Sequence, residues 1–192
     1  MDSQRRRLLR AMTDEVGEHG YVATSAARVY GRARVSSRAF YEQFTDKEDC
    51  FLAAYEAGVT HFIDQVMRTG TADGSDDAVA QLEQLLERYL LALHDDPHFA
   101  RAFLVEIYAV GPRALRQRAA VQQRFVQLVT ATVESMLGSV PLSDDDRFAV
   151  ETLVGGVTFL VTARVAAGDG AGLLALRDPL VALVTRLLRI HA

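Results

Sequence analysis

Apolar residues recur every three or four positions along most of the chain. Leu8, Leu9, Met12 and Val16 form the first such series, and this spacing places their side chains on one face of a helix. Strand-like alternation of apolar and polar residues is absent from the sequence. The pattern therefore predicts an all-α protein of about nine helices. The predicted ranges are 4–19, 24–31, 36–43, 46–69, 76–94, 97–109, 112–137, 143–167 and 173–190.

Residues that commonly start helices support these boundaries. Thr24 precedes the second predicted helix as a candidate N-cap. The segment 45–48 reads Thr-Asp-Lys-Glu, the pattern of a capping box in which the Thr hydroxyl and the Glu carboxylate satisfy free backbone N–H groups. Asp96-Pro97 puts proline at a first helical position. The segment 69–75 is the predicted flexible connection.

Two very short helices, 24–31 and 36–43, follow one another after a few residues. Isolated helices below about 12 residues are marginal in water, so both must pack on longer neighbours. Such a pair is typical of a helix-turn-helix, whose second helix enters the DNA major groove. Ser36 would cap that helix, and Ser37 and Arg38 would project from its first turn. The hydroxyl of Tyr41, the ammonium of Lys47 and Thr24 are suited to phosphate contacts.

The charge is unevenly distributed. Residues 1–41 contain eight arginines against four acidic residues, whereas the whole chain has a formal net charge of −4. A basic end on an acidic body favours a polyanion-binding module, because its field attracts nucleic acid to one face. The alternative is a solvated, arginine-rich helix face.

Residues 5–56 resemble the DNA-binding domain of the TetR (tetracycline-repressor) family of transcriptional regulators. The motifs that carry the resemblance are Gly20-Tyr21, Thr24-Ser25, Ala33-Arg34-Val35-Ser36, Phe40-Tyr41-Glu42-Gln43-Phe44 and Asp46-Lys47-Glu48. The resemblance implies phosphate contacts at Thr24, Tyr41 and Lys47, and base reading from the helix after Ser36. Arg34 stands where the family commonly has a turn glycine, so it either tolerates a left-handed conformation or adds a DNA contact.

The resemblance implies two domains, with the helix 46–69 joining them. Residues 1–48 would form the helix-turn-helix DNA-binding domain, and residues 49–192 a larger helical domain for effector binding and dimerisation. The two last helices are rich in apolar residues, and two copies would form a four-helix bundle across a two-fold axis. The alternative is that both helices are core of a monomer. The predicted interface residues are Leu153, Gly155, Gly156, Phe159, Leu160, Leu180, Leu183, Val184 and Leu187.

The resemblance also implies a small-molecule pocket in the middle helices. The apolar and aromatic candidates favour a hydrophobic effector of unknown identity, although aromatic residues at helical spacing are more often ordinary core. The candidate effector-binding residues are Phe62, Val66, Tyr89, Phe103, Ile107, Phe125, Val129 and Phe159. We expect no cofactor and no metal, since Asp96 between His94 and His98 is better explained as a helix cap.

The sequence predicts a cytoplasmic transcriptional regulator and not an enzyme. It predicts a repressor that a small, largely apolar effector releases from a palindromic operator. Catalytic signatures such as a phosphate-binding glycine loop or a nucleophile elbow are absent. The apolar run 153–163 is shorter than the roughly 20 residues of a transmembrane helix. Cys50, the single cysteine, is either a buried small side chain or a redox sensor. Two alternatives stay open: an architectural DNA-binding protein without an effector, and an all-helical enzyme with an apolar pocket.

Overall fold

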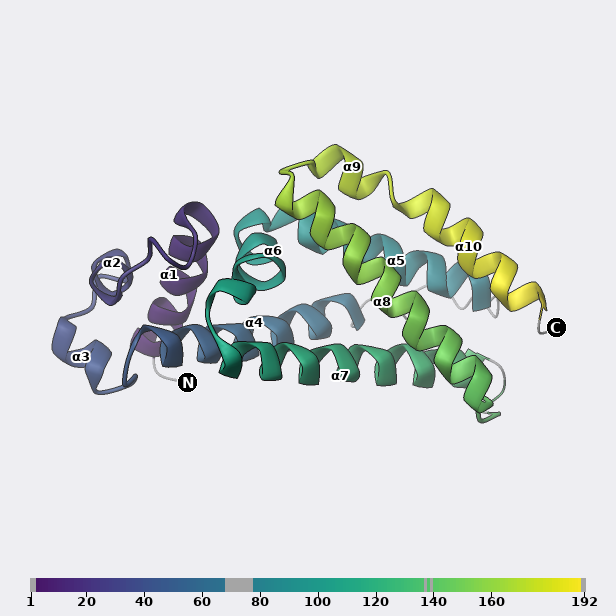
Figure 1. Cartoon of the computed structure of the whole chain (residues 1–192), viewed down its shortest axis with the longest axis horizontal. Coiled ribbons are helices and arrows are strands. Elements are labelled where there is room, and N and C mark those ends of the chain that lie inside the picture. Colours follow the sequence, from purple (N-terminus) through teal and green to yellow (C-terminus); the bar gives the residue numbers. More distant parts are fainter. Residues whose placement is uncertain (1–2, 68–77, 137, 139, 191–192) are drawn as a thin grey trace. The chain divides into compact units, whose positions relative to one another are not determined.

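The computed structural model describes residues 3–67, 78–136, 138 and 140–190, and these residues contain helices and no strand (Figure 1). The all-α prediction is therefore confirmed. The elements are α1 (Ser3–His19), α2 (Ala26–Arg32), α3 (Ser37–Tyr41), α4 (Lys47–Met67), α5 (Ala78–Asp95), α6 (Pro97–Leu104), the 3₁₀ helix η1 (Glu106–Ala109), α7 (Pro112–Met136), α8 (Asp144–Ala166), α9 (Gly170–Leu174) and α10 (Arg177–Ile190).

Two of the predicted helices are each divided in the structure. The predicted helix 97–109 is α6 followed by η1, because the backbone at Val105 leaves the α-helical geometry and the chain continues as a 3₁₀ turn. The predicted helix 173–190 is α9 followed by α10. Asp169 starts α9 by accepting a hydrogen bond from the Gly172 N–H at 2.8 Å. The predicted flexible connection 69–75 lies outside the described residues.

The chain forms two compact units that interleave along the sequence. Unit 1 contains residues 1–64 and 95–118, and unit 2 contains residues 65–94 and 119–192. This division differs from the predicted boundary after residue 48. The reason is tertiary: α1 packs against α6 as well as against α2, so α6 and η1 belong with the amino-terminal helices.

Aromatic side chains from α4 and α6 form the centre of unit 1. Phe51 and Tyr55 each meet the Phe103 ring edge-on, at centroid distances of 5.7 and 5.3 Å. Phe99 stacks on Phe62 at 5.3 Å. Edge-to-face and stacked pairs add specific attraction to the burial of apolar surface. These contacts join α4 to α6 and give the amino-terminal helices a rigid base.

The helices of unit 2 leave one long apolar helix largely uncovered. Leu90, Leu93 and Leu173 are buried, but among the side chains of α8 only Val161 is buried. By length and composition alone α8 could cross a membrane, and 11% of its most apolar stretch is buried in the chain. In the single chain, the apolar side chains of α8 are thus mostly partly or largely exposed, with Phe159 at 73%.

Candidate DNA-binding interface

The helix-turn-helix consists of α2, a connecting turn and α3, which together form the reading head (residues 26–41). Ser25, rather than the predicted Thr24, caps α2, and its hydroxyl accepts the Arg28 N–H at 3.3 Å. Thr24 lies one residue earlier and is 2% exposed. Its hydroxyl donates to the Gly20 carbonyl at 2.9 Å. The side chain therefore stabilises the turn before α2, and the phosphate contact predicted for it stays a prediction.

Arg34 occupies the connecting turn with a left-handed backbone, at φ 53°. The Val35 N–H donates to the Tyr30 carbonyl at 3.0 Å, and the Arg34 N–H donates to the Gly31 carbonyl at 3.1 Å. This pair of bonds is the Schellman motif that ends many helices, and its left-handed position usually holds glycine. The predicted left-handed conformation of Arg34 is confirmed, and its side chain is exposed.

The short helix α3 presents polar side chains to solvent. Ser36 caps it as predicted, since its hydroxyl accepts the Ala39 N–H at 3.1 Å. Ser37, Arg38 and Tyr41 are exposed, while Phe40 is fully buried and fixes α3 on the domain. The three side chains predicted to read bases or hold the DNA backbone therefore lie together on the free face of α3.

Glu42 is a polar residue at this face that the sequence interpretation passed over. Its carboxylate accepts a hydrogen bond from the Arg38 Nε at 2.9 Å, and the Arg38 and Glu42 side chains are 89% and 59% exposed. The i, i+4 spacing could have revealed the pair. Because the bond uses Nε, it leaves the two terminal amino groups of Arg38 free to meet the edge of a base.

Lys47 begins α4 and points into unit 1. Its ammonium donates to the carbonyls of Tyr21 at 3.0 Å and Thr24 at 2.8 Å. It also lies 4.0 Å from the centroid of the Tyr21 ring. Burial lowers the pKa of Lys47 below its ordinary value. The predicted phosphate contact is therefore not the interaction that this side chain makes here.

The start of α4 also differs from the predicted capping box. Asp46, not Thr45, accepts the N–H of Asp49, the third residue of the helix, at 2.8 Å. The Asp49 carboxylate accepts the Thr45 N–H at 3.2 Å in return. The reciprocal arrangement is present but is shifted by one residue, because an aspartate caps as well as a threonine does.

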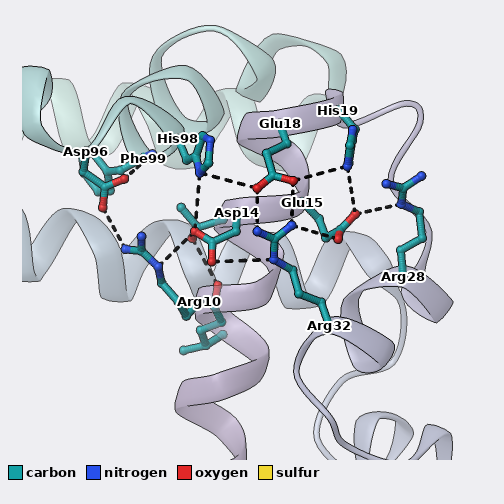
Figure 2. Close-up of polar contacts among 12 residues, drawn as sticks. Arg10, Asp14, Glu15, Glu18, His19, Arg28, Arg32, Asp96, His98 and Phe99 are labelled. Carbon is teal, nitrogen blue, oxygen red and sulfur yellow. Dashed lines mark hydrogen bonds and ion pairs between the residues drawn. The ribbon is translucent and has the colours of Figure 1, made fainter.

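Several of the amino-terminal arginines are paired within the protein. Figure 2 shows acidic side chains of α1 directed toward Arg32 of α2. Arg32 binds Glu18 at 2.6 Å and Glu15 at 3.2 Å, and Arg28 binds Glu15 at 2.8 Å. Burial alone would raise the pKa of Glu15, but the hydrogen bonds from Arg28 and Arg32 outweigh it and lower the pKa. These arginines stabilise the packing of α2 on α1, so the basic excess counted from the sequence overstates the charge offered to DNA.

The same cluster predicts sensitivity to acid. The hydrogen bond from Arg32 lowers the pKa of Glu18 from 4.5 to about 2. A carboxyl group with a lowered folded-state pKa stabilises the protein above the unfolded pKa, and this stabilisation is lost as the pH falls from about 4.5 toward 2. Glu18→Gln should therefore flatten the decline of unfolding free energy over that pH range. Denaturant titrations at a series of pH values measure it, and an unchanged slope would contradict the assignment.

Residues 8–54 match the family described as bacterial regulatory proteins, tetR family. The amino-terminal domain belongs to the TetR family. It is thus the DNA-binding domain of a transcriptional regulator. No curated protein sequence matches the chain.

Solved structures of TetR-type regulators share the fold over nearly the whole chain. The fatty acid degradation regulator FadR from Bacillus halodurans is 19% identical, with a TM-score of 0.81 over 95% of both chains. FadR from Bacillus subtilis, solved with stearoyl-CoA, is 17% identical, with a TM-score of 0.77 over 93% of this chain and 96% of that one. A TetR-like regulator from Rhodococcus sp. RHA1 is 20% identical, with a TM-score of 0.66 over 93% of each chain.

The candidate effector residues are divided between the two units. Phe62, Phe103 and Ile107 are buried in unit 1. In unit 2, Tyr89 meets Phe125 edge-on at a centroid distance of 6.4 Å, and Val66 is buried while Val129 is partly exposed. Each group is packed within its own unit.

Phe159 does not fit the effector prediction. Its side chain is 73% exposed on α8, which is incompatible with a place in the wall of an internal pocket. Exposure of an aromatic ring is instead what the dimer prediction requires. Leu160 and Leu183 are also exposed, at 39% and 44%. Of the other predicted interface residues, Gly155 and Gly156 are exposed, Leu153 and Val184 are partly exposed, Leu180 is buried, and the side chain of Leu187 lies outside the described residues.

The remaining sequence candidates have structural roles. Cys50 is fully buried, and burial raises the pKa of its thiol to about 12, so the thiol stays protonated at neutral pH and is not suited to redox sensing. Asp96 caps α6 as predicted, accepting the Phe99 N–H at 3.0 Å, and it also binds Arg10 at 2.8 Å.

Proposed function

We propose that this protein is a homodimeric, ligand-responsive repressor that binds a palindromic operator. The observation that carries the proposal is the exposed face of α3, where Ser37, Arg38 and Tyr41 stand together on a TetR-family helix-turn-helix. Arginine commonly reads guanine in the major groove, and a tyrosine hydroxyl can hold phosphate. Thr24 and Lys47, which point inward, are not part of the proposed contact set, and Arg34 and Ser36 border it.

The exposed surface of α8 supports a dimer. A side chain added at Gly155 or Gly156 would meet nothing within 4 Å in this chain, although glycine inside a helix costs about 1 kcal/mol. Two glycines beside the exposed Phe159 and Leu160 would let two copies of the helix approach closely. Two-fold symmetry would then place two reading heads about 34 Å apart, one DNA turn, which favours a palindromic site.

The proposed effector is a largely apolar small molecule. The support is the apolar character of the candidate residues in both units and the shared fold with regulators that include a FadR solved with stearoyl-CoA. A long-chain acyl-CoA is therefore the first effector to test. Its proposed action is a population shift toward a state in which the two heads no longer match successive major grooves. A cytoplasmic location follows from a DNA target.

Selection of bound duplexes from a random DNA library tests the DNA-binding part of the proposal. The purified chain should enrich a palindrome at near-physiological salt, and stearoyl-CoA should release it from that duplex, with free coenzyme A as the matched control. Binding that depends on salt but shares no sequence would instead support an architectural protein. If the protein, freed of any bound ligand, binds no DNA, the proposal is contradicted. The enzyme alternative would then be the next hypothesis to test.

Base reading is expected from Arg38. Arg38→Ala should change which bases are preferred within each half-site, because a bidentate contact to a base discriminates by about 1–3 kcal/mol. Tyr41→Phe should weaken cognate and scrambled duplexes alike, since a phosphate contact carries no base information. Binding isotherms on matched duplexes measure both effects. Equal losses on all sequences for Arg38→Ala would refute its role.

A further inference from the structure

Tyr21, in the turn between α1 and α2, is hydrogen-bonded through its backbone by side chains from two other helices. The Tyr21 N–H donates to the Glu106 carboxylate of η1 at 3.0 Å, and the Tyr21 carbonyl accepts the Lys47 ammonium of α4 at 3.0 Å. Lys47 also reaches the Thr24 carbonyl, the residue before the α2 cap, at 2.8 Å. Residues distant in the sequence thus fasten both ends of the turn that leads into the reading head.

The ammonium of Lys47 is directed into unit 1 by two carbonyl acceptors and an aromatic ring. A lysine ammonium carries three N–H donors. Two of them are directed to the carbonyls of Tyr21 and Thr24, and the Tyr21 ring lies 4.0 Å away as a cation–π partner. Burial lowers the pKa of Lys47, which accords with a partly desolvated group. A DNA phosphate would have to compete with the two carbonyls and the Tyr21 ring, which together direct this half-buried ammonium inward.

The Glu106 carboxylate is also held by more than one contact. Its second oxygen lies 3.2 Å from the Arg101 guanidinium, and a side chain at Gly20 would come within 3.1 Å of the carboxylate. Gly20 itself has a left-handed backbone, at φ 83°. The carboxylate therefore sits against bare backbone, where it can receive the Tyr21 N–H. A Cβ at position 20 would crowd the carboxylate, and the left-handed backbone there favours glycine.

We propose that Lys47 and Glu106 are positioning residues for DNA recognition, which hold the Tyr21 turn so that the reading head keeps its docking orientation, and that Lys47 is not a phosphate contact. The inference rests on the proposed function. It departs from the expectation that the sequence resemblance gives for Lys47. It also assigns a role in DNA binding to Glu106, which carries a negative charge and could not itself attract DNA.

The salt dependence of operator binding separates the two roles of Lys47. Loss of one phosphate contact lowers the slope of log affinity against log salt by about 1. Lys47→Met, which keeps the side-chain length, should weaken operator binding roughly tenfold or more, because two carbonyls lose a charged hydrogen bond, but should leave the slope unchanged. Arg116→Met, at an exposed position on α7, is the charge-matched control. A slope lower by about 1 than that of the control would overturn the inference.

Glu106 supplies the rescue experiment. Glu106→Ala should lower operator affinity without changing the salt slope, and Glu106→Gln should restore most of it, because the amide oxygen can still accept the Tyr21 N–H. Melting temperatures of all variants are measured in parallel, and binding is compared well below the lowest of them. A loss of affinity by Glu106→Gln equal to that by Glu106→Ala would contradict the positioning role.

A further readout needs no substitution, because Lys47 is the only lysine of the chain. Selective ¹³C/¹⁵N-lysine labelling gives a single side-chain signal in NMR spectra. We expect this signal to indicate a hydrogen-bonded ammonium in the free protein and to stay in place when the selected operator is added. A large shift on operator binding would overturn the inference. Failure to select any operator would refute the proposed function instead, while the signal of the free protein would still report the contacts of Lys47.

Discussion

Gly17→Ala should destabilise the protein strongly. A methyl group at this position would lie 2.5 Å from the His98 Cα and 2.6 Å from its carbonyl oxygen. These are backbone atoms of α6, so relief requires the α1–α6 packing to open. Overpacking of this kind costs about 1–3 kcal/mol and occasionally more, and we expect a loss of about 3 kcal/mol in unfolding free energy. Denaturant unfolding followed by circular dichroism measures it.

Gly31→Ala is the matched control. Gly31 lies in α2, and an added methyl group there would meet nothing within 4 Å. Since alanine favours a helix over glycine, this change should stabilise the protein by about 0.5–1 kcal/mol. If Gly17→Ala proved as stable as Gly31→Ala, the close approach of α1 to α6 would be wrong.

Phe159→Glu is expected to have the largest effect on DNA binding. Its ring is 73% exposed in the isolated chain, and in the proposed dimer two copies would face each other near the two-fold axis. Burial of two carboxylates together is strongly unfavourable. The variant should be monomeric, and the loss of bivalent binding should reduce operator affinity by roughly 100-fold or more.

Analytical ultracentrifugation and operator titrations test this prediction together. Leu115→Glu is the matched control, because Leu115 is also exposed, at 43%, but lies on α7 and outside the proposed interface. It should leave both the mass and the affinity near those of the unsubstituted chain. A dimeric Phe159→Glu protein, or a monomer that still binds the full palindrome tightly, would place the interface elsewhere.

The apolar helix α8 carries a largely exposed surface in the single chain. Its length and hydropathy would suit a membrane span, and the sequence predicted a place for this helix in a dimer interface. In the chain, its outward face carries Gly155 and Gly156 beside Phe159. Helices with small residues on one face can pack closely on one another, and a second copy of α8 is the partner with the required shape.

The sequence by itself determined the features that depend on neighbouring residues. Helical periodicity predicted the all-α fold, and the segment around Ser36 predicted the cap of α3 and the exposure of Arg38 and Tyr41. The left-handed turn at Arg34 was expected because Arg34 stands where the TetR family commonly has a turn glycine. Each of these features is governed by contacts within about four residues, where spacing and residue type are sufficient.

Only the tertiary structure decided where the long side chains go. The bond between Tyr21 and Glu106 joins residues 85 positions apart, and the pairing of Lys47 with the Tyr21 turn spans 26. No local pattern encodes such contacts, because they depend on how whole helices pack. A lysine or arginine looks equally free in any sequence, but the carbonyls and carboxylates brought beside it by packing determine whether its charge is available to DNA.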